Sequence, residues 1–385
     1  MMMRARRLVV VAALLAGAAL WAGLLSAAPA SATGSVYTVV VDGQPTPGEP
    51  WAFEKFFPHA IKVHQGDIIT IAWNGTDFPH TASFVNTADP DAWRQQQQAP
   101  GATYAVAVPD TAVGGDDPDE TVLNPTVLFP SSFGCGTAAA PCTFDGTSVV
   151  SSGLLFSNPS AQPSFSVQVT APVGHYSLLC LIHGGMEIPV DVVSADQSIP
   201  SPAQVAAQAA REAARSNAVD APKADTQAQQ VQTATIGGGH TRWSISAGGF
   251  YKQVSANEYP DAGLTLRVGD QLQVNGLEEI HTATFPLSAA STVPFIVSQC
   301  EVPGPDTPAT SPADCASPSQ FQVALNNQAV APTPSNELVD PAAFVNGGLI
   351  ATGQSSTFVA VAPGTYTMVC LVHGPEMSTA VTVKS

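Results

Sequence analysis

Residues 180–186 read Cys-Leu-Ile-His-Gly-Gly-Met, and residues 370–377 read Cys-Leu-Val-His-Gly-Pro-Glu-Met. Each stretch brings together a thiol, an imidazole and a thioether, with glycine or proline residues that suit a tight turn. A second imidazole precedes each stretch, at His80 and at His281. Two imidazoles and a thiolate, with a weak axial thioether, form the ligand set of a blue-copper electron-transfer centre. The sequence therefore predicts two such centres.

The sequence around these ligands is repeated in the same order in both halves of the chain. A Gly66-Asp67 turn and an alternating segment lead to His80, and a Gly269-Asp270 turn and a similar segment lead to His281. Short segments in which apolar and polar residues alternate, bounded by Gly, Pro and Asp, predict strands. The chain holds 33 Pro and 31 Gly and few long helical patterns. We therefore expect an all-β chain of two β-sandwiches.

Residues 198–233 differ in composition from both halves. Ser201-Pro202 predicts the start of a helix, and the Ala-rich stretch from Ala203 to Arg215 favours a short one. The polar stretch 220–233 lacks an apolar stripe, so we expect it to be flexible. This division predicts one domain at residues 33–197, a partly helical linker at 198–233, and a second domain at 234–385.

Six cysteines divide into ligands and disulfides. In an exported protein, neighbouring cysteines outside the ligand loops should pair. The expected pairs are Cys135 with Cys142 and Cys300 with Cys315. A metal site made from the first pair is the alternative, but no histidine lies near it. The two loop cysteines would then remain free to bind metal.

Both halves resemble the cupredoxins, the family of plastocyanin, amicyanin and azurin. The region from Gly66 to His80 looks like the first-ligand region of plastocyanin, and residues 364–370 look like the strand leading to the family's copper thiolate. The Met spacing of the first loop is similar to that of amicyanin, and the spacing of the second falls between amicyanin and plastocyanin. The resemblance covers most of both halves but neither the insertions nor the linker.

The resemblance implies Greek-key folds, copper that cycles between Cu(I) and Cu(II), and electron transfer through the edge of the loop histidine. It implies an axial Met and three equatorial ligands at each centre: Met186 with His80, Cys180 and His183, and Met377 with His281, Cys370 and His373. The long insertions, residues 85–160 and 286–345, depart from the family. They could cover the copper end or dock a partner. Whether both centres hold copper stays open.

The formal net charge is −17. Such a chain repels nucleic-acid phosphates, so we do not expect it to bind nucleic acid. A basic redox partner protein would be attracted, although the charge could serve solubility alone. Residues 1–32 combine basic residues, an apolar run and Ala30-Ser31-Ala32, which together resemble an export signal, with an uncleaved anchor as the alternative. We expect a secreted, periplasmic or cell-surface protein with no stable membrane span after signal removal.

The remaining histidines argue against an enzyme. Multicopper oxidases and copper nitrite reductases need extra histidines, typically His-x-His pairs or a His beside the copper Cys. The chain has no His-x-His, and apolar residues flank both loop cysteines. We therefore expect an electron carrier. The alternatives are a copper-storage protein and a cupredoxin scaffold for protein interaction with one decayed site. The four histidines interpreted as ordinary polar residues are His59, His64, His175 and His240.

Overall fold

The computed structural model describes residues 34–73, 79–99, 101–112, 120–155, 164–301, 306–317 and 320–385. The predicted export signal, residues 1–32, lies outside this part of the chain. Within the described ranges, no helix has the length and apolarity needed to cross a bilayer. Strands dominate the structure and form several sheets, so the predicted all-β class is confirmed.

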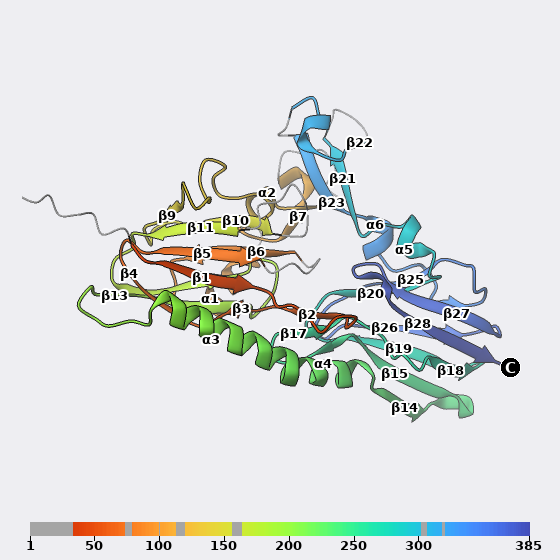
Figure 1. The fold of residues 1–385 in the computed structure, drawn as a ribbon. Coiled ribbons are helices and arrows are strands. Elements are labelled where there is room, and N and C mark those ends of the chain that lie inside the picture. Colours follow the sequence, from red (N-terminus) through yellow and green to blue (C-terminus); the bar gives the residue numbers. More distant parts are fainter. Residues whose placement is uncertain are drawn as a thin grey trace, which may run out of the picture. The chain divides into compact units, whose positions relative to one another are not determined.

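Two five-stranded sheets form the first half, residues 34–197 (Figure 1). One has the order β3-β1-β5-β11-β9, and the other β10-β6-β12-β13-β4. The strands of the first sheet are Phe56–Phe57 (β3), Val36–Val41 (β1), Ile68–Trp73 (β5), Ser164–Val169 (β11) and Cys142–Phe144 (β9). Those of the second are Val150–Leu155 (β10), His80–Val85 (β6), Gly174–Leu179 (β12), Glu187–Val193 (β13) and Ile61–His64 (β4). Because β1 is parallel to β5 and β13 to β4, the chain crosses between sheets and is no simple series of hairpins.

Alternating side chains of these strands enclose an apolar core. Val39 of β1 and Ile69 of β5 are buried, while their neighbours along each strand are more exposed. Ile61 and Val63 of β4 are buried from the other sheet. Each such side chain contributes roughly 1.5–3 kcal/mol through burial. The alternation predicted from the sequence is confirmed at these positions.

The second half, residues 231–385, likewise contains two five-stranded sheets. Its sheets have the orders β14-β15-β19-β26-β24 and β18-β28-β27-β20-β25. The first contains Val231–Thr235 (β14), Thr241–Ala247 (β15), Gln271–Gly276 (β19), Ser355–Ala360 (β26) and Glu337–Leu338 (β24). The second contains Leu264–Arg267 (β18), Gly374–Lys384 (β28), Gly364–Cys370 (β27), His281–Phe285 (β20) and Val345–Ile350 (β25). Read in reverse, the second order matches β10-β6-β12-β13-β4 strand for strand, so the two ligand loops occupy the same place in their sheets.

The segment between the halves is more ordered than the sequence predicts. The predicted helix is confirmed as Pro202–Arg215 (α3), which Ser201 and Gln204 cap reciprocally. A π-helical turn at Ser216–Asp220 and the helix Ala221–Ala228 (α4) follow. The expectation of a flexible stretch after Asp220 is therefore wrong. Alanines form the missing apolar stripe, because three of them on α4 are fully buried, and small side chains let the helix backbone approach its neighbours.

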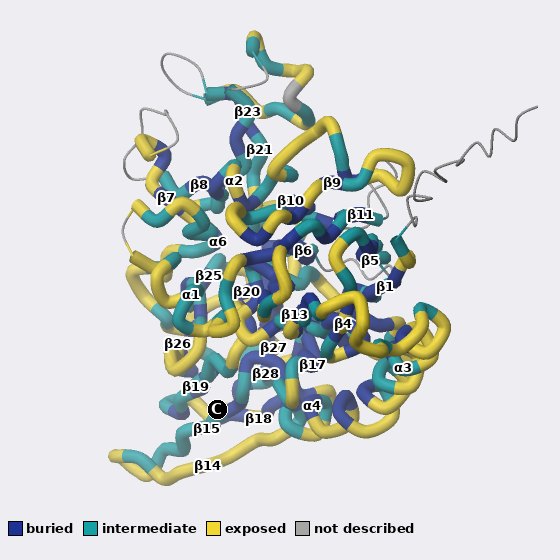
Figure 2. Tube along the Cα trace, turned by 90° about the vertical axis from the view of Figure 1, so that its left-hand side faces the viewer, coloured by how far each residue is buried: buried dark blue, intermediate teal, exposed yellow. Residues whose placement is uncertain are grey.

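A three-stranded sheet joins the halves directly. Trp51–Phe53 (β2) of the first half pairs with Val254–Ala256 (β17) of the second, and β17 also pairs with Gly249–Phe250 (β16). Apolar residues of β2, β17, α3 and α4 pack together in one cluster. In Figure 2 the outer surface of α3 is exposed, whereas the strands near it contain long buried stretches.

The two insertions meet in a sheet of their own, with the order β22-β21-β23-β8-β7. The first insertion supplies Ala107–Pro109 (β7) and Thr121–Leu123 (β8), besides the helices Pro90–Gln97 (α1) and Pro125–Leu128 (α2). The second supplies Ile296–Cys300 (β21), Thr307–Pro308 (β22) and Phe321–Leu325 (β23), besides Ala289–Thr292 (α5) and Asn327–Val330 (α6). Gln322 Nε2 donates to Asp110 Oδ1 at 2.7 Å across this contact. The insertions thus bind the two halves to each other.

Both predicted disulfides are confirmed. Cys135 is bonded to Cys142, and Cys300 is bonded to Cys315. The first bond ties the loop at Cys135 to the start of β9, and the second ties the end of β21 to the loop before β23. Cys180 and Cys370 are free thiols, and both are buried.

Because α4 packs closely on β16, a methyl group added at Gly249 should lower the stability of the folded protein. A Cβ atom at Gly249 would lie 1.8 Å from the carbonyl oxygen of Ala224, so Gly249→Ala forces the backbone apart. We expect a loss of about 1–3 kcal/mol in the free energy of unfolding, measured by urea denaturation of the metal-free protein. Gly237→Ala is the matched control, because nothing lies within 4 Å of a Cβ there. Equal denaturation midpoints for the two variants would contradict this packing.

Candidate metal centres

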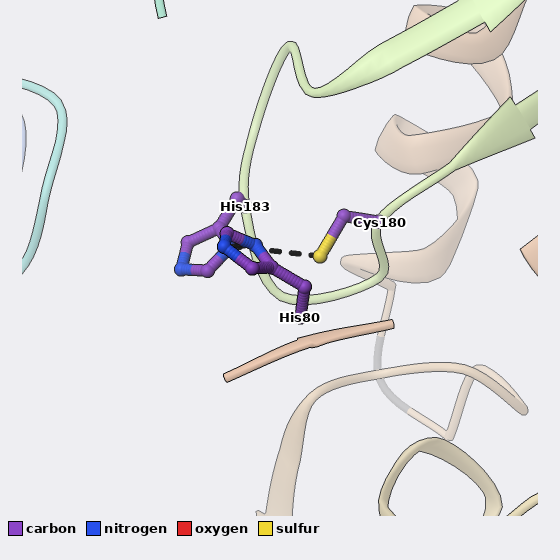
Figure 3. Close-up of side chains that lie close together, drawn as sticks. All are labelled: His80, Cys180 and His183. Atoms are coloured by element: carbon purple, nitrogen blue, oxygen red, sulfur yellow. Dashed lines mark hydrogen bonds between the residues drawn. The ribbon is translucent and has the colours of Figure 1, made fainter. Parts of the chain in front are cut away.

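In the first half, His80, Cys180 and His183 converge on one point. His80 begins β6, Cys180 follows β12, and His183 lies in the loop before β13. Nδ1 of His183 lies 3.0 Å from Nδ1 of His80 and 3.5 Å from Sγ of Cys180. Figure 3 shows the three side chains turned toward one another, with Cys180 and His183 on the same loop. Each residue thus offers one ligand atom to a shared position.

The second half contains the same arrangement. His281 begins β20, Cys370 ends β27, and His373 precedes β28. The two Nδ1 atoms are 3.1 Å apart, and Sγ of Cys370 lies 3.4 Å from His373 Nδ1 and 3.8 Å from His281 Nδ1. Within each group, the ligand atoms all lie within 4.8 Å of one another. The structure therefore brings together the six His and Cys residues that the sequence analysis selects, in two groups.

The ligand loops are closed by backbone contacts. The N–H of Cys180 donates to the carbonyl of Met186 at 2.9 Å, and Gly185 adopts a left-handed φ of 71° that suits glycine. In the second loop, Cys370 pairs with Gly374 in the register of β27 and β28. Both proposed axial residues, Met186 and Met377, are fully buried in the same apolar clusters as their cysteines. Their role as axial ligands stays a prediction.

A threonine after the upstream histidine supports each cysteine. The N–H of Thr81 donates to Sγ of Cys180 at 3.3 Å, and Thr282 does the same to Cys370 at 3.4 Å. Each threonine hydroxyl accepts the N–H of the leucine after the cysteine, at 2.7 Å for Leu181 and 2.8 Å for the second loop. The sequence analysis missed this role. The signal was the repeated His-Thr-Ala motif.

The first loop has an additional support from the insertion. Arg94 of α1 donates from Nη1 to the carbonyl of Cys180 at 2.5 Å and from Nη2 to the carbonyl of Met186 at 2.9 Å. Its Nε donates to Glu187 at 3.2 Å. One guanidinium therefore joins both ends of the ligand loop. No sequence signal identified Arg94, because it lies far from the loop in the chain.

The two groups differ in charge. Burial lowers the pKa of His80, but contacts with Asp42 and Cys180 outweigh it and raise the pKa to about 10. Burial opposes ionisation of Cys180, yet the nearby His183 and His80 hold the pKa of that thiol well below its usual value. Metal binding at the first group would therefore displace a proton mainly from imidazole.

In the second group, burial is the largest cause of every pKa shift. It lowers the pKa of His281 to about 3, and it raises the pKa of the Cys370 thiol. Burial, and then the neighbouring His281 and His183, also lower the pKa of His373. Metal binding here would displace the thiol proton. The effect of His183 on His373 indicates that the two groups lie within electrostatic reach of each other.

The second half covers the loop histidine of the first. Nε2 of His183 lies 3.7 Å from Oε1 of Glu279, and only 8% of His183 is exposed. Glu279 lies against Glu54, which is itself hydrogen-bonded to Ser255 of β17. Burial and then the charge of Glu54 raise the pKa of Glu279 to about 8. Glu279, which lies before the second insertion, is therefore one of the residues that cover this histidine.

The other four histidines lie in neither group. His59 contacts Glu212, and His175 contacts Asp191, both through Nδ1. Nε2 of His64 lies 2.9 Å from the carbonyl of Gln197, and His240 packs beside Gly269. Met368, on the strand before Cys370, is fully buried in the second core. The four histidines, interpreted from the sequence as ordinary polar residues, thus have protein partners outside the two groups.

The donor set of each group fits copper. Thiolate and thioether are soft ligands that suit Cu(I), and imidazole suits copper in general. His80, Cys180, His183, His281 and Cys370 are buried and His373 is partly buried, so access of water and external ligands to both groups is restricted. The six residues therefore match the requirements of a copper site.

Comparisons with known proteins add a likeness of fold. No protein-family model matches the chain, and no curated protein matches it. It is similar to a Cu(I) form of an amicyanin mutant at 14% identity and a TM-score of 0.20, covering 37% of this chain and 82% of that chain. It is also similar to dithionite-reduced auracyanin from the photosynthetic bacterium Roseiflexus castenholzii at 16% identity and a TM-score of 0.24, covering 42% and 99%. Auracyanin B is similar at 16% identity and a TM-score of 0.23, covering 42% and 89%. The assignment of the two candidate centres rests on the ligand geometry.

The threonine contacts predict matched losses in the two halves. Thr81→Val and Thr282→Val keep the side-chain shape, but they remove the hydroxyl that accepts the buried N–H of Leu181 or of Leu371. We expect each to lower the free energy of unfolding of the metal-free protein by about 1–3 kcal/mol in urea. Thr143→Val, at an exposed position on β9, is the control and should change little. A loss equal to that of the control would contradict the assigned contact.

The buried carboxyl of Glu279 predicts a pH dependence of stability. Its pKa rises on folding from about 4.3 to about 8, so the folded state favours the protonated form. The contribution of Glu279 to the stability of the folded state is fully present below about pH 4 and is lost as the pH rises toward about 8. In the metal-free protein, thermal unfolding should occur at a lower temperature at about pH 8 than at about pH 5. Glu279→Gln should reduce this difference, and an unchanged difference would refute the assignment.

Proposed function

We propose that this chain is an exported copper protein with two cupredoxin domains, residues 33–197 and 234–385, joined by residues 198–233. Each domain would hold one type 1 copper centre and pass single electrons. The observation that carries this proposal is the twofold convergence of one thiol sulfur and two imidazole nitrogens. The identical order of strands around both groups supports the tandem arrangement.

The proposed ligands follow the expected sets. The thiol and the two imidazoles would be equatorial, and the buried methionine axial: His80, Cys180, His183 and Met186, and then His281, Cys370, His373 and Met377. Bound copper would supply a centre that accepts or releases one electron. The residues of the chain hold the ligands in one geometry. A rigid frame of this kind favours rapid transfer, because neither oxidation state requires the ligands to move far.

An electron carrier is favoured over an enzyme by the sequence, which lacks the extra histidines of oxidases. Two disulfides support an oxidising compartment, in agreement with secretion, a periplasmic location or the cell surface. The acidic chain would attract a basic redox partner, and salt would weaken that association.

Copper storage is the second candidate, and one observation favours it. The edge of His183 is covered by Glu279, whereas a carrier that meets its partner at that edge would expose it. Fast and reversible reduction of the bound copper would support the carrier. Tight binding without fast exchange would support storage.

Copper loading tests the proposal. The mature protein should bind two coppers per chain and show an intense visible absorption from thiolate-to-Cu(II) charge transfer. Cys180→Ser and Cys370→Ser should each keep one such centre, because the two ligand groups are separate. Ser131→Ala, outside both groups, is a control that should keep two. A colourless parent protein, or one that binds no copper, would refute the proposal.

A further inference from the structure

A buried contact connects the two proposed centres. Nε2 of His183 lies 3.7 Å from Oε1 of Glu279, and Glu279 is two residues before His281 in the chain. His183 is a proposed ligand of the first centre, and His281 of the second. One side-chain contact and a short covalent segment therefore link a ligand of one centre to a ligand of the other.

Neighbouring residues of both halves hold this contact in place and bury it. Gln253 of the second half donates from Nε2 to the carbonyl of Gly184 in the first ligand loop at 2.7 Å. Glu54, beside Glu279, is 2% exposed and bonded to Ser255. Pairing of β2 with β17 fixes the backbones that carry these side chains. The edge of the first loop histidine is thus directed into the molecule.

The two centres differ in what touches their upstream histidine. Asp42 follows β1 and Gly248 follows β15, the corresponding strand, and both have a left-handed φ, of 61° and 70°. Oδ2 of Asp42 lies 3.5 Å from Nε2 of His80, and both residues are fully buried. The first centre therefore has a carboxylate against its histidine, and the second has a glycine in the equivalent place.

The geometry at Gly248 excludes a carboxylate there. A Cβ at this position would lie 2.8 Å from the carbonyl oxygen of Ala256 and 3.1 Å from Nε2 of His281. Asp42, by contrast, is held firmly. Its Oδ1 accepts the N–H groups of Gly43 at 2.6 Å and Phe53 at 3.0 Å. The difference between the centres is thus built into the backbone.

A carboxylate against the outer nitrogen of a ligand imidazole makes that imidazole a stronger donor. A buried negative charge also favours the more positive state of a nearby metal, because the interior screens charge weakly. Both effects stabilise Cu(II) over Cu(I) at the first centre. Its reduction potential should therefore be the lower one.

We propose, on the basis of the proposed function, that the two centres form an internal donor–acceptor pair. With copper bound at both centres, His183, Glu279 and the segment to His281 would provide the path for one electron from the first centre to the second. The first centre would lose the electron that the second gains, so the transfer would break no bond and consume no proton. Asp42 is the positioning residue that sets this direction.

Potentials test the direction. Cys370→Ser and Cys180→Ser isolate the first and second centres, and the first should have the lower potential. Asp42→Asn keeps a residue that tolerates left-handed φ and should raise the potential of the first centre alone. We expect at least a tenfold change in its Cu(II)-to-Cu(I) ratio, which is about 59 mV for one electron. Asp196→Asn, at an exposed site, removes the same charge as a control. An unchanged reduction potential of the first centre in Asp42→Asn would overturn the role assigned to Asp42.

The rate of internal transfer tests the path. After rapid half-reduction of the copper-loaded protein, the visible bands should relax at a rate independent of protein concentration. Glu279→Leu should slow this relaxation several-fold, Glu279→Gln should slow it less, and Glu278→Leu, at the exposed neighbour, should leave it unchanged. A rate proportional to protein concentration would overturn the internal path while leaving the two copper centres intact. If the copper-treated, unmutated protein shows neither visible band, the proposed function itself is refuted.

Discussion

The burial of two free thiols is the constraint on which the rest of the structure depends. Cys180 and Cys370 have no exposed surface, and a buried polar group without partners destabilises a fold. Each thiol is therefore met by two imidazole nitrogens and by the N–H of a threonine. The pairing of β6 with β12, and of β20 with β27, brings these partners from distant parts of the chain. The sandwich thus brings the upstream histidine, His80 or His281, to a loop that already holds the cysteine and the second histidine.

The same group of one cysteine and two histidines occurs in both halves, but the residues around the two groups differ. The first group carries a carboxylate against its upstream histidine and a guanidinium across its loop. The second has glycine at the place of that carboxylate, and burial is the largest cause of the pKa shifts of its ligands. Contacts just outside the ligands thus give two similar sites different electrical environments. Glu54 of the first half and Glu279 of the second lie against each other where the halves meet, and Glu279 contacts His183 of the first group.

The sequence predicted what depends on local pattern. The ligand loops, the alternating strands, the capped helix at Ser201 and the short-range disulfides all have signals within a few residues. It did not predict the contacts between distant segments. The three-residue strand β2 pairs with β17, and neither has a pattern long enough to reveal its partner. Asp42 could not be identified because its role depends on a left-handed turn and on His80, which lies far along the chain. The buried stripe of α4 escaped notice because alanine resembles a linker residue as much as a core residue.

Electron paramagnetic resonance of the fully oxidised, copper-loaded protein tests the central claim of two thiolate-bound type 1 centres most directly. Strong delocalisation of the unpaired electron onto a cysteine sulfur narrows the copper hyperfine splitting. Two Cu(II) spins per chain, both with a narrow splitting, is the predicted result. Spins with the wide splitting of ordinary tetragonal Cu(II), bound by nitrogen and oxygen alone, would contradict it.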